Sequence, residues 1–355
     1  MQEERIRFLE TLLGTICPSG YEEEAARVWR DEAATFADRC WVDQHGNSIA
    51  AVNEGGSPRV MLAGHIDEIG LMITHIDESG FLSFSGIGIW DAQVLPGQRV
   101  RIRTQSGIEM GMIGRKPVHL LDAEDQKKVV KIEDLWIDIG AHSRAEAADV
   151  VSIGDPAVLD YGFIRLRNGL IASRGLDDRM GAFVVLEAAR LLAAASPKAA
   201  VFAVGTVQEE IGYRGAVTSA FTLQPDIGFA VDVAHATDTP SMEKIRKRIG
   251  EARIGGGPVV ARGAFVNPQL FRRVLAAAHT QGIPVQVQGC PSDTGTDTDV
   301  MQLSHRGVAT SLVSVANRYM HSPCEVVHLD DLDRAARLIA ATVAGLDEHT
   351  SLVSS

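Results

Sequence analysis

The sequence predicts an α/β protein with a mixed sheet, covered by helices on both faces and interrupted by a small all-β domain. Apolar strand-like runs alternate with amphipathic helical segments in both terminal parts of the 355-residue chain, which favours a sheet covered on both sides. From about residue 68 to 165 the chain has short β-type segments such as FLSFSGIG and QRVRIRTQSG, the pattern of an inserted β unit. We therefore predict a discontinuous domain of residues 1–67 and 166–355, and an inserted domain of residues 68–165.

The N-terminal elements follow from helix and turn signals. Residues 1–40 predict two helices, separated by Pro18, Ser19 and Gly20, which together interrupt a helix. Next, WVDQHGNSIAAVN contains a turn between two strand-like pieces, and SPRVMLAGHID is an apolar strand that ends in polar residues. This strand delivers His65 and Asp67 to its carboxyl end.

The alternation of helices and strands resumes after Asp177. RMGAFVVLEAARLLAAA and PQLFRRVLAAAHTQG predict helices, and DDLDRAARLIAATVAGL predicts the last helix. The segments AAVFAVGTVQ, DIGFAVDVA, VQVQGC and GVATSLVSVA predict strands. In the inserted region only SRAEAADVV has a helical pattern.

Composition narrows the class of protein. With 45% hydrophobic and 23% charged residues the chain is typical of a globular protein, and its net charge of −12 with no basic run argues against a nucleic-acid partner. The acidic, helical N-terminus does not resemble a signal peptide, and no apolar run of about 18 residues predicts a membrane span. We therefore expect a cytoplasmic protein. The cysteines form no CxxC pair, so neither a zinc knuckle nor a disulfide framework is indicated; they are Cys17, Cys40, Cys290 and Cys324.

Polar residues follow five of the apolar segments. In open α/β sheets, ligands bind beyond the carboxyl ends of the strands. These segments are MLAGHID with His65 and Asp67, SRGLDDRMG with Asp177 and Asp178, TVQEEIG with Glu209 and Glu210, GFAVDVAHATDTP with Asp232 and His235, and ANRYMHSP with His321. Taken singly, each has a common structural explanation: Asp177 and Asp178 can cap the next helix, and His65 can be a hydrogen-bonded core residue.

Taken together, these side chains predict a metal site. Several carboxylates gathered in a cleft repel one another unless a cation is present. Imidazole and carboxylate ligands suit zinc, cobalt or manganese, and the lack of nearby cysteines favours a catalytic site. Residues two apart in a strand point the same way, so Asp67 can accept the second ring N–H of His65. Of Glu209 and Glu210, one can bind metal while the other accepts a proton from a metal-bound water, and spacing leaves open which does which.

The same segments carry a family resemblance. AGHIDEIG, GLDDRMG, TVQEEIGYRGA, AVDVAHATDTP, GTDTD and RYMHSP resemble, in order, the motifs of the TET-type dinuclear-metal aminopeptidases, and the likeness covers nearly the whole chain. This family includes glutamyl and deblocking aminopeptidases, some formerly labelled endoglucanases. The resemblance implies two divalent metal ions per subunit, most often zinc, with cobalt or manganese as alternatives. The resemblance implies that His65 and Asp232 hold one metal, that Glu210 and His321 hold the other, and that Asp177 bridges both. It also implies that Glu209 is the general base and that Asp67 orients the metal ligand His65.

The resemblance also implies an activity and an assembly. It implies a metalloaminopeptidase that releases N-terminal residues from unfolded peptides with a metal-activated water as nucleophile. The inserted unit resembles a PDZ-like dimerisation domain, and family members form dimers that build a hollow tetrahedral dodecamer. Because GTDTD departs from the commoner GTDA pattern after three residues, we expect Asp297 near the site and Asp299 in a supporting loop.

The side-chain preference is predicted only broadly. IGGGPVVARGAFVNP is expected to be a loop that shapes the substrate pocket, where Arg262 could pair with an acidic side chain, although a surface or structural arginine is more common. Since nothing else marks a charged pocket, we expect neutral aliphatic residues with broad tolerance.

Three other functions remain open from the sequence. A metal-dependent carboxypeptidase or deacylase of related fold would use much the same ligands. A glycosidase would need two carboxyl groups about 5 to 9.5 Å apart across a glycosidic bond, which adjacent glutamates rarely provide. A non-catalytic peptide-binding scaffold would be expected to have lost the metal positions, and here they are intact.

Overall fold

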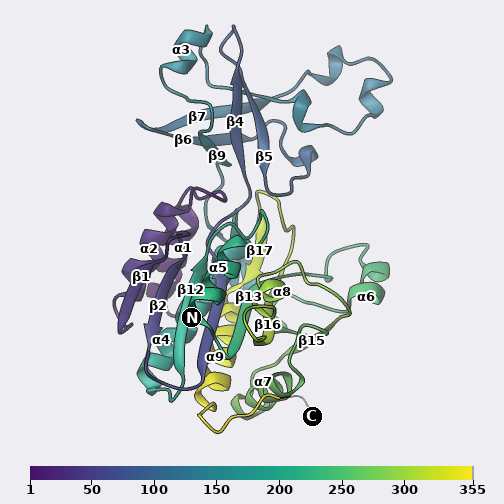
Figure 1. Ribbon diagram of the computed structural model, residues 1–355. Helices are drawn as coiled ribbons and strands as arrows, with labels where there is room; N and C mark the ends of the chain where they lie inside the picture. The colour runs from purple at the N-terminus through teal and green to yellow at the C-terminus, as the bar shows by residue number, and fades with distance from the viewer. Residues whose placement is uncertain (354–355) are drawn as a thin grey trace.

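The structure is a computed structural model that describes residues 1–353, an α/β body that carries a β barrel at one end (Figure 1). The body is built on an eight-stranded mixed sheet with the order β1-β2-β12-β3-β13-β16-β14-β15. These strands are β1 (Arg39–Val42), β2 (Ser48–Val52), β3 (Arg59–His65), β12 (Ala200–Thr206), β13 (Ile227–His235), β14 (Val259–Gly263), β15 (Gln286–Cys290) and β16 (Ala309–Asn317).

The four central strands of this sheet are parallel. β3 lies between β12 and β13, and β13 also pairs with β16. The register aligns Thr206 with His65, and His235 with Asn317. The carboxyl ends of the four strands therefore meet at one edge of the sheet, where the chain turns into loops rich in polar side chains. β3 and β12 are almost wholly buried, as expected for central parallel strands.

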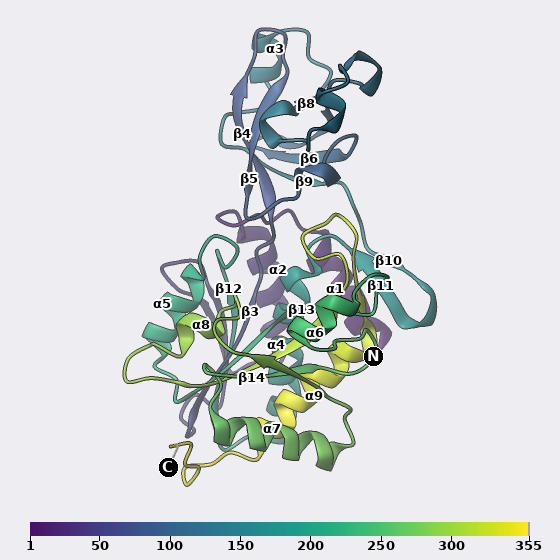
Figure 2. The same ribbon diagram turned by 90° about the vertical axis from the view of Figure 1, so that its right-hand side faces the viewer.

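Helices cover both faces of the sheet. α4 packs on β3, β12 and β13, and α9 packs alongside α4. α5 contacts β12 and β3, and α8 contacts β13 and β16, so that the strands lie between these helices and α4 (Figure 2). The α-helices of the body are α1 (Glu3–Gly14), α2 (Glu23–Ala33), α4 (Leu176–Ala195), α5 (Arg214–Leu223), α6 (Glu243–Ile249), α7 (Pro268–Gln281), α8 (Thr298–Met301) and α9 (Leu329–Ala344).

The inserted segment forms a closed antiparallel barrel with the order β4-β5-β8-β7-β6-β9. Its strands are β4 (Gly70–Ile76), β5 (Leu82–Ile87), β6 (Arg99–Thr104), β7 (Gly107–Gly114), β8 (Trp136–Asp138) and β9 (Pro156–Leu159), with helix α3 (Arg144–Ala148) between β8 and β9. It has its own aliphatic core, which includes Leu71, Val100, Ile102 and Ile137. The barrel stands over the edge where the parallel strands end (Figure 1).

A small sheet and several short turns complete the molecule. β11 (Leu170–Ser173) pairs with β10 (Ile164–Arg165) and with β17 (Glu325–His328). The 3₁₀ turns are η1 (Ala92–Val94), η2 (Val118–Leu120), η3 (Asp125–Lys127), η4 (Ile132–Asp134) and η5 (Arg167–Gly169). Within residues 1–353, no helix is both long enough and apolar enough to cross a membrane.

The predicted fold class is confirmed, with two differences in detail. VVARG, which was expected to lie in a loop, forms β14 and pairs antiparallel with β16. RGAVTSAFTL forms α5, which the sequence reading missed because a glycine and three β-branched residues weaken its helical pattern. The last two residues of the predicted insert, Ile164–Arg165, pair with β11 of the body.

Candidate metal centre

The structure brings histidine and carboxylate side chains together at the carboxyl edge of the parallel strands. We call this group the edge cluster; it consists of His65, Asp177, Glu209, Glu210, Asp232 and His321. Nε2 of His65 lies 3.4 Å from Oδ1 of Asp177, and Nε2 of His321 lies 3.3 Å from Oδ2 of the same carboxylate. Nε2 of His321 is also 3.3 Å from Oε2 of Glu210. Asp177 thus stands between the two imidazoles.

Two groups of side chains, drawn from the edge cluster and its neighbour Asp178, have the spacing of cation ligands. Ligand atoms of His65, Asp177 and Glu210 all lie within 4.8 Å of one another, and so do those of His65, Asp178 and Asp232. Imidazole nitrogen with carboxylate oxygen is the donor set that zinc and similar divalent ions accept. The cluster therefore has room and chemistry for cation binding on both sides of His65.

Backbone carbonyl groups orient both histidines. Nδ1 of His65 lies 3.1 Å from the carbonyl oxygen of Asp67, and Nδ1 of His321 lies 2.9 Å from the carbonyl oxygen of Ile89. A carbonyl oxygen can only accept a hydrogen bond, so each Nδ1 carries the hydrogen and each Nε2 is directed at the cluster. The sequence reading expected the Asp67 side chain in this role for His65; its Oδ1 is 3.4 Å from Nδ1, farther than the backbone oxygen.

The Asp67 carboxylate has a different set of partners. Its Oδ1 accepts the backbone N–H of Glu209 at 3.1 Å, and its Oδ2 accepts that of Glu210 at 3.2 Å. The hydroxyl of Ser19 donates to Oδ2 at 2.6 Å. One buried carboxylate therefore sets the path of the chain through both glutamates.

Two further buried acids, Glu325 and Asp178, hold the backbone of residues in the site. The sequence reading named only Asp178, and it gave this residue no separate role. Glu325, at the start of β17, accepts the backbone N–H of Asp177 at 2.9 Å and that of His321 at 3.0 Å. Asp178 accepts the backbone N–H of His65 at 3.3 Å. A Cβ on Gly181 would lie 2.2 Å from Oδ2 of Asp178, so the glycine makes room for this carboxylate. The spacing in DDRMG was the available sequence signal, whereas Glu325 has none beyond its position four residues after His321.

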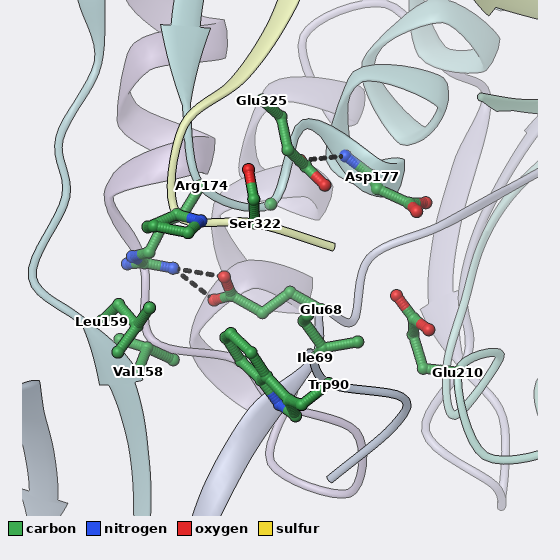
Figure 3. A pocket seen from close by; sticks show the side chains of 12 residues that line it. Glu68, Ile69, Trp90, Val158, Leu159, Arg174, Asp177, Glu210, Ser322 and Glu325 are labelled. Carbon is green, nitrogen blue, oxygen red and sulfur yellow. Dashed lines mark hydrogen bonds and ion pairs between the residues drawn. The ribbon is translucent and has the colours of Figure 1, made fainter. Parts of the chain in front are cut away.

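A buried ion cluster lies beside the site, between the barrel and the body (Figure 3). Glu68 accepts hydrogen bonds from Arg174 and, at 2.9 Å, from Nη2 of Arg179. Both arginines also donate to the carbonyl oxygen of Thr15. Removing one partner from such a group leaves a buried charge unpaired. This cluster ties α1, α4 and the start of the barrel together next to Asp177.

The pKa values in the edge cluster show that its carboxylates are crowded and buried, so that added positive charge would stabilise them. Burial, joined by repulsion from Asp232 and Asp297 and opposed by His65, raises the pKa of Glu209 to about 11. Burial also raises the pKa of Asp232 well above its usual range, with Asp177 adding to the effect. Burial would lower the pKa of His321, but hydrogen bonds to Asp177 and Glu210 outweigh it and raise this pKa to about 11. Such a crowd of buried acids is relieved by a cation.

Unpartnered oxygens within the cluster fit a cation as well. In residues 1–353, Oε1 of Glu209 and Oε1 of Glu210 are buried and have no hydrogen-bond partner. Buried polar atoms are almost always paired unless a bound group or water completes them. The residues present therefore suit divalent cations.

The remaining sequence candidates are divided between the site and the scaffold. Asp297 is buried and its Oδ2 accepts the hydroxyl hydrogen of Thr206, at the end of β12, at 2.6 Å. Asp299 holds its own loop, because it accepts the backbone N–H groups of Thr294 and Gly295.

Arg262 does not line the site, contrary to the pocket that the sequence suggested. β14 runs antiparallel to β16, so Arg262 near its end lies toward the opposite edge of the sheet. There its guanidinium stacks over the ring of Phe271 at 5.3 Å. The glycine-rich flanks of VVARG concealed the strand and therefore the direction of this arginine.

His235, at the end of β13, is largely exposed. Burial of part of its ring lowers its pKa, against the attraction of Asp177. It lies outside the groups of converging ligand atoms found in residues 1–353.

Comparison with known proteins gives matches along nearly the whole chain. It matches the M42 glutamyl aminopeptidase family over residues 46–338. It is 37% identical over 331 residues to the lysyl aminopeptidase of Pyrococcus furiosus, a match covering 92% of this chain and 93% of the relative.

Solved structures of peptidases also match this chain in fold. The TET aminopeptidase of the marine sediment archaeon Thaumarchaeota archaeon SCGC AB-539-E09 has a TM-score of 0.92 at 32% identity, covering 98% of this chain and 97% of that one. The TET1 peptidase of Pyrococcus horikoshii has a TM-score of 0.84 at 35% identity, covering 96% and 100%. Because these matches include both the barrel and the strand ends that carry the edge cluster, the chain belongs to the M42 glutamyl aminopeptidase family.

Proposed function

We propose that this protein is a metal-dependent aminopeptidase that removes N-terminal residues from unfolded peptides, with two divalent cations held by the edge cluster. The observation that carries the proposal is the placement of Asp177 between His65 and His321, with each Nε2 within 3.4 Å of a different oxygen of the carboxylate. His65 and Asp232 would hold one cation, Glu210 and His321 the other, and Asp177 both.

When bound, such a pair of cations supplies Lewis acidity that polarises the scissile carbonyl and makes a water molecule more acidic. Glu209 is the acid that this ligand assignment leaves free. It would take the proton from the attacking water and deliver it to the leaving amine. Its buried Oε1 has no partner in residues 1–353, which suits a proton carrier.

The surrounding residues would set the positions of these groups. Asp67 holds the backbone of both glutamates, and this keeps Glu209 and Glu210 in fixed relation. Glu325 does the same for Asp177 and His321. Pre-positioned groups avoid reorganisation during the reaction, so these acids would contribute to the rate without touching the substrate.

The substrate proposal follows from the relatives and from Arg262. The Pyrococcus furiosus relative is a lysyl aminopeptidase. Since Arg262 stacks on Phe271 away from the cluster, nothing in the described residues supports a preference for acidic side chains. We propose broad tolerance centred on neutral side chains, and a lysyl substrate is the first alternative to compare.

We also propose that the chain self-associates through its barrel. The Pyrococcus horikoshii TET1 peptidase can assemble into a tetrahedron or a large octahedral shell. On β7 of the present chain, Ile108, Met110 and Met112 alternate and are 52%, 47% and 48% exposed. An apolar stripe of this kind suits burial against a second copy. Light scattering on purified protein should give twelve times the mass of one chain if the dodecamer forms.

One experiment tests the activity and its metal dependence together. The protein is stripped with a chelator, reloaded separately with zinc, cobalt or manganese, and assayed on leucyl, lysyl and glutamyl amides. We expect cleavage to vanish on stripping and to return with at least one ion. A matched peptide pair, with a free and an acetylated N-terminus, separates this proposal from a carboxypeptidase or deacylase. Cleavage of the acetylated peptide alone, or full activity without metal, would contradict the proposal.

A further inference from the structure

A loop of the barrel reaches into the edge cluster. Residues Gly88–Trp90 follow β5, and the carbonyl oxygen of Ile89 lies 2.9 Å from Nδ1 of His321. This contact places the ring hydrogen on Nδ1 and leaves Nε2 of the neutral ring as the atom able to bind a cation. A backbone atom of the inserted barrel therefore decides which nitrogen of His321 faces Asp177 and Glu210.

The same loop packs against the second ligand of that cation. Gly88 has φ +76, and a Cβ built on it would lie 2.6 Å from Cγ2 of Ile69 and 3.6 Å from Cβ of Glu210. No side chain fits there without displacing Ile69, and a left-handed φ is itself strained for other residues. Figure 3 shows Ile69 beside Glu210, with Trp90 next to them. The loop thus contacts His321 and lies close to Glu210.

Trp90 anchors the loop to the connection between the two domains. Its indole Nε1 donates to the carbonyl oxygen of Gly70 at 2.7 Å. Gly70 begins β4 and follows His65 by only five residues. On the other side, a Cβ on Gly86 would lie 3.0 Å from Cδ1 of Trp90, so the indole lies close against β5. The loop is therefore held relative to the segment that also carries His65 and Asp67.

We propose that the Gly88–Trp90 loop is a positioning element for the cation bound by Glu210 and His321, so that the barrel completes one of the two cation sites. The inference rests on the proposed function, since it assumes that both cations bind. It assigns the barrel a role in the active centre in addition to self-association.

A matched pair of glycine substitutions tests this role. Gly88→Ala and Gly97→Ala both place a side chain at a left-handed position of the barrel, with φ of +76 and +80. At Gly97, however, a Cβ would meet nothing within 4 Å. Backbone strain is therefore similar in the two variants, while only Gly88→Ala presses on Ile69, which lies beside Glu210.

The experiment measures Co²⁺ binding to the metal-free protein. Titration calorimetry gives the affinities, and the visible absorption of the bound ion reports its ligands. We expect wild type and Gly97→Ala each to bind two ions per chain, and each site to have the same affinity in both proteins. Gly88→Ala should keep one site and bind the second about 10–100-fold more weakly, the usual effect of disturbing groups that orient ligands. Trp90→Phe, which keeps a ring but removes the donor to Gly70, should weaken the same site and decides the matter if Gly88→Ala does not fold.

The outcomes are distinguishable. Two unchanged affinities in Gly88→Ala and Trp90→Phe would overturn the inference and leave the proposed function standing. Equal weakening of both sites, or the same loss in Gly97→Ala, would also overturn it, because the effect would then be general destabilisation. A wild-type protein that binds no Co²⁺ would overturn the proposed function and this inference with it.

Discussion

The body and the barrel bury different kinds of side chain. The core of the barrel is apolar, and between residues 70 and 159 the described side chains include no buried polar or charged group. The body buries a histidine, several carboxylates and three arginines next to its largest aliphatic cluster. Burying charges is unfavourable unless they are paired or bind a cation. The contrast indicates that in the body the side chains for function lie among those that stabilise the fold, whereas the core of the barrel only stabilises it.

The largest effect should come from Glu209, the acid of the body that the proposed ligand assignment leaves free. Glu209→Gln removes the proposed proton carrier and keeps the shape of the side chain, so we expect kcat to fall about 10²–10⁴-fold with two cations still bound. The neighbouring Glu210→Gln should instead lose affinity for one cation. Steady-state kinetics and metal analysis on both variants check the division of roles. If Glu209→Gln lost metal and Glu210→Gln did not, the two assignments would have to be exchanged.

A substitution in the barrel core should change stability without changing the site. Ile137 is fully buried among the aliphatic residues of the barrel, and Ile137→Ala should lower the free energy of unfolding by about 2–5 kcal/mol through lost burial and a cavity. Ile153→Ala, at a 66% exposed position between α3 and β9, should change it by no more than about 0.5 kcal/mol. Denaturant unfolding measures both. Loss of a cation in Ile137→Ala would show that the two regions are not separable in this way.

A smaller effect should follow from loosening the support of the glutamates. Ser19→Ala deletes the 2.6 Å hydrogen bond to Asp67, and we expect kcat or metal affinity to fall about 10-fold, at the low end for groups that orient ligands. Ser219→Ala is the control, since this buried hydroxyl donates to Gly215 at 2.7 Å within α5. Equal activities in the two variants would mean that Asp67 is held without Ser19.

The last prediction concerns the pH dependence of stability, through a buried acid near the site. Burial, helped by Asp67, raises the pKa of Glu22 from 4.5 to about 7. A raised pKa means that folding favours the protonated form, so this contribution to stability is complete below pH 4.5 and is lost as pH rises through 7. Over that window the metal-free wild type should lose about 3 kcal/mol relative to Glu22→Gln. Parallel unfolding curves for the two proteins at all pH values would contradict this.

The α/β class and the inserted β unit follow from periodicity, because apolar alternation and helical spacing are local properties of the chain. RGAVTSAFTL and VVARG were missed as α5 and β14 for a local reason too. A glycine and β-branched residues weaken the helical pattern of the first segment, and the glycines around the second weaken its strand pattern. The direction of Arg262 depended on that missed strand. The choice between a substrate contact and a structural role for Arg262 therefore stayed open until the direction of the strand was known.

Sequence alone determined which residues reach the carboxyl edge of the sheet. His65 and Asp232 lie on β3 and β13, and Glu210 and His321 follow β12 and β16, four strands whose parallel pairing brings their ends together. Asp177 reaches the same edge at the start of α4. Only the tertiary structure decided how they are held. The carbonyl of Ile89 comes from the barrel, and Glu325 from β17, to orient groups far away in the chain. Backbone oxygens have no signature in the sequence, and a contact between distant segments depends on packing that no local pattern encodes.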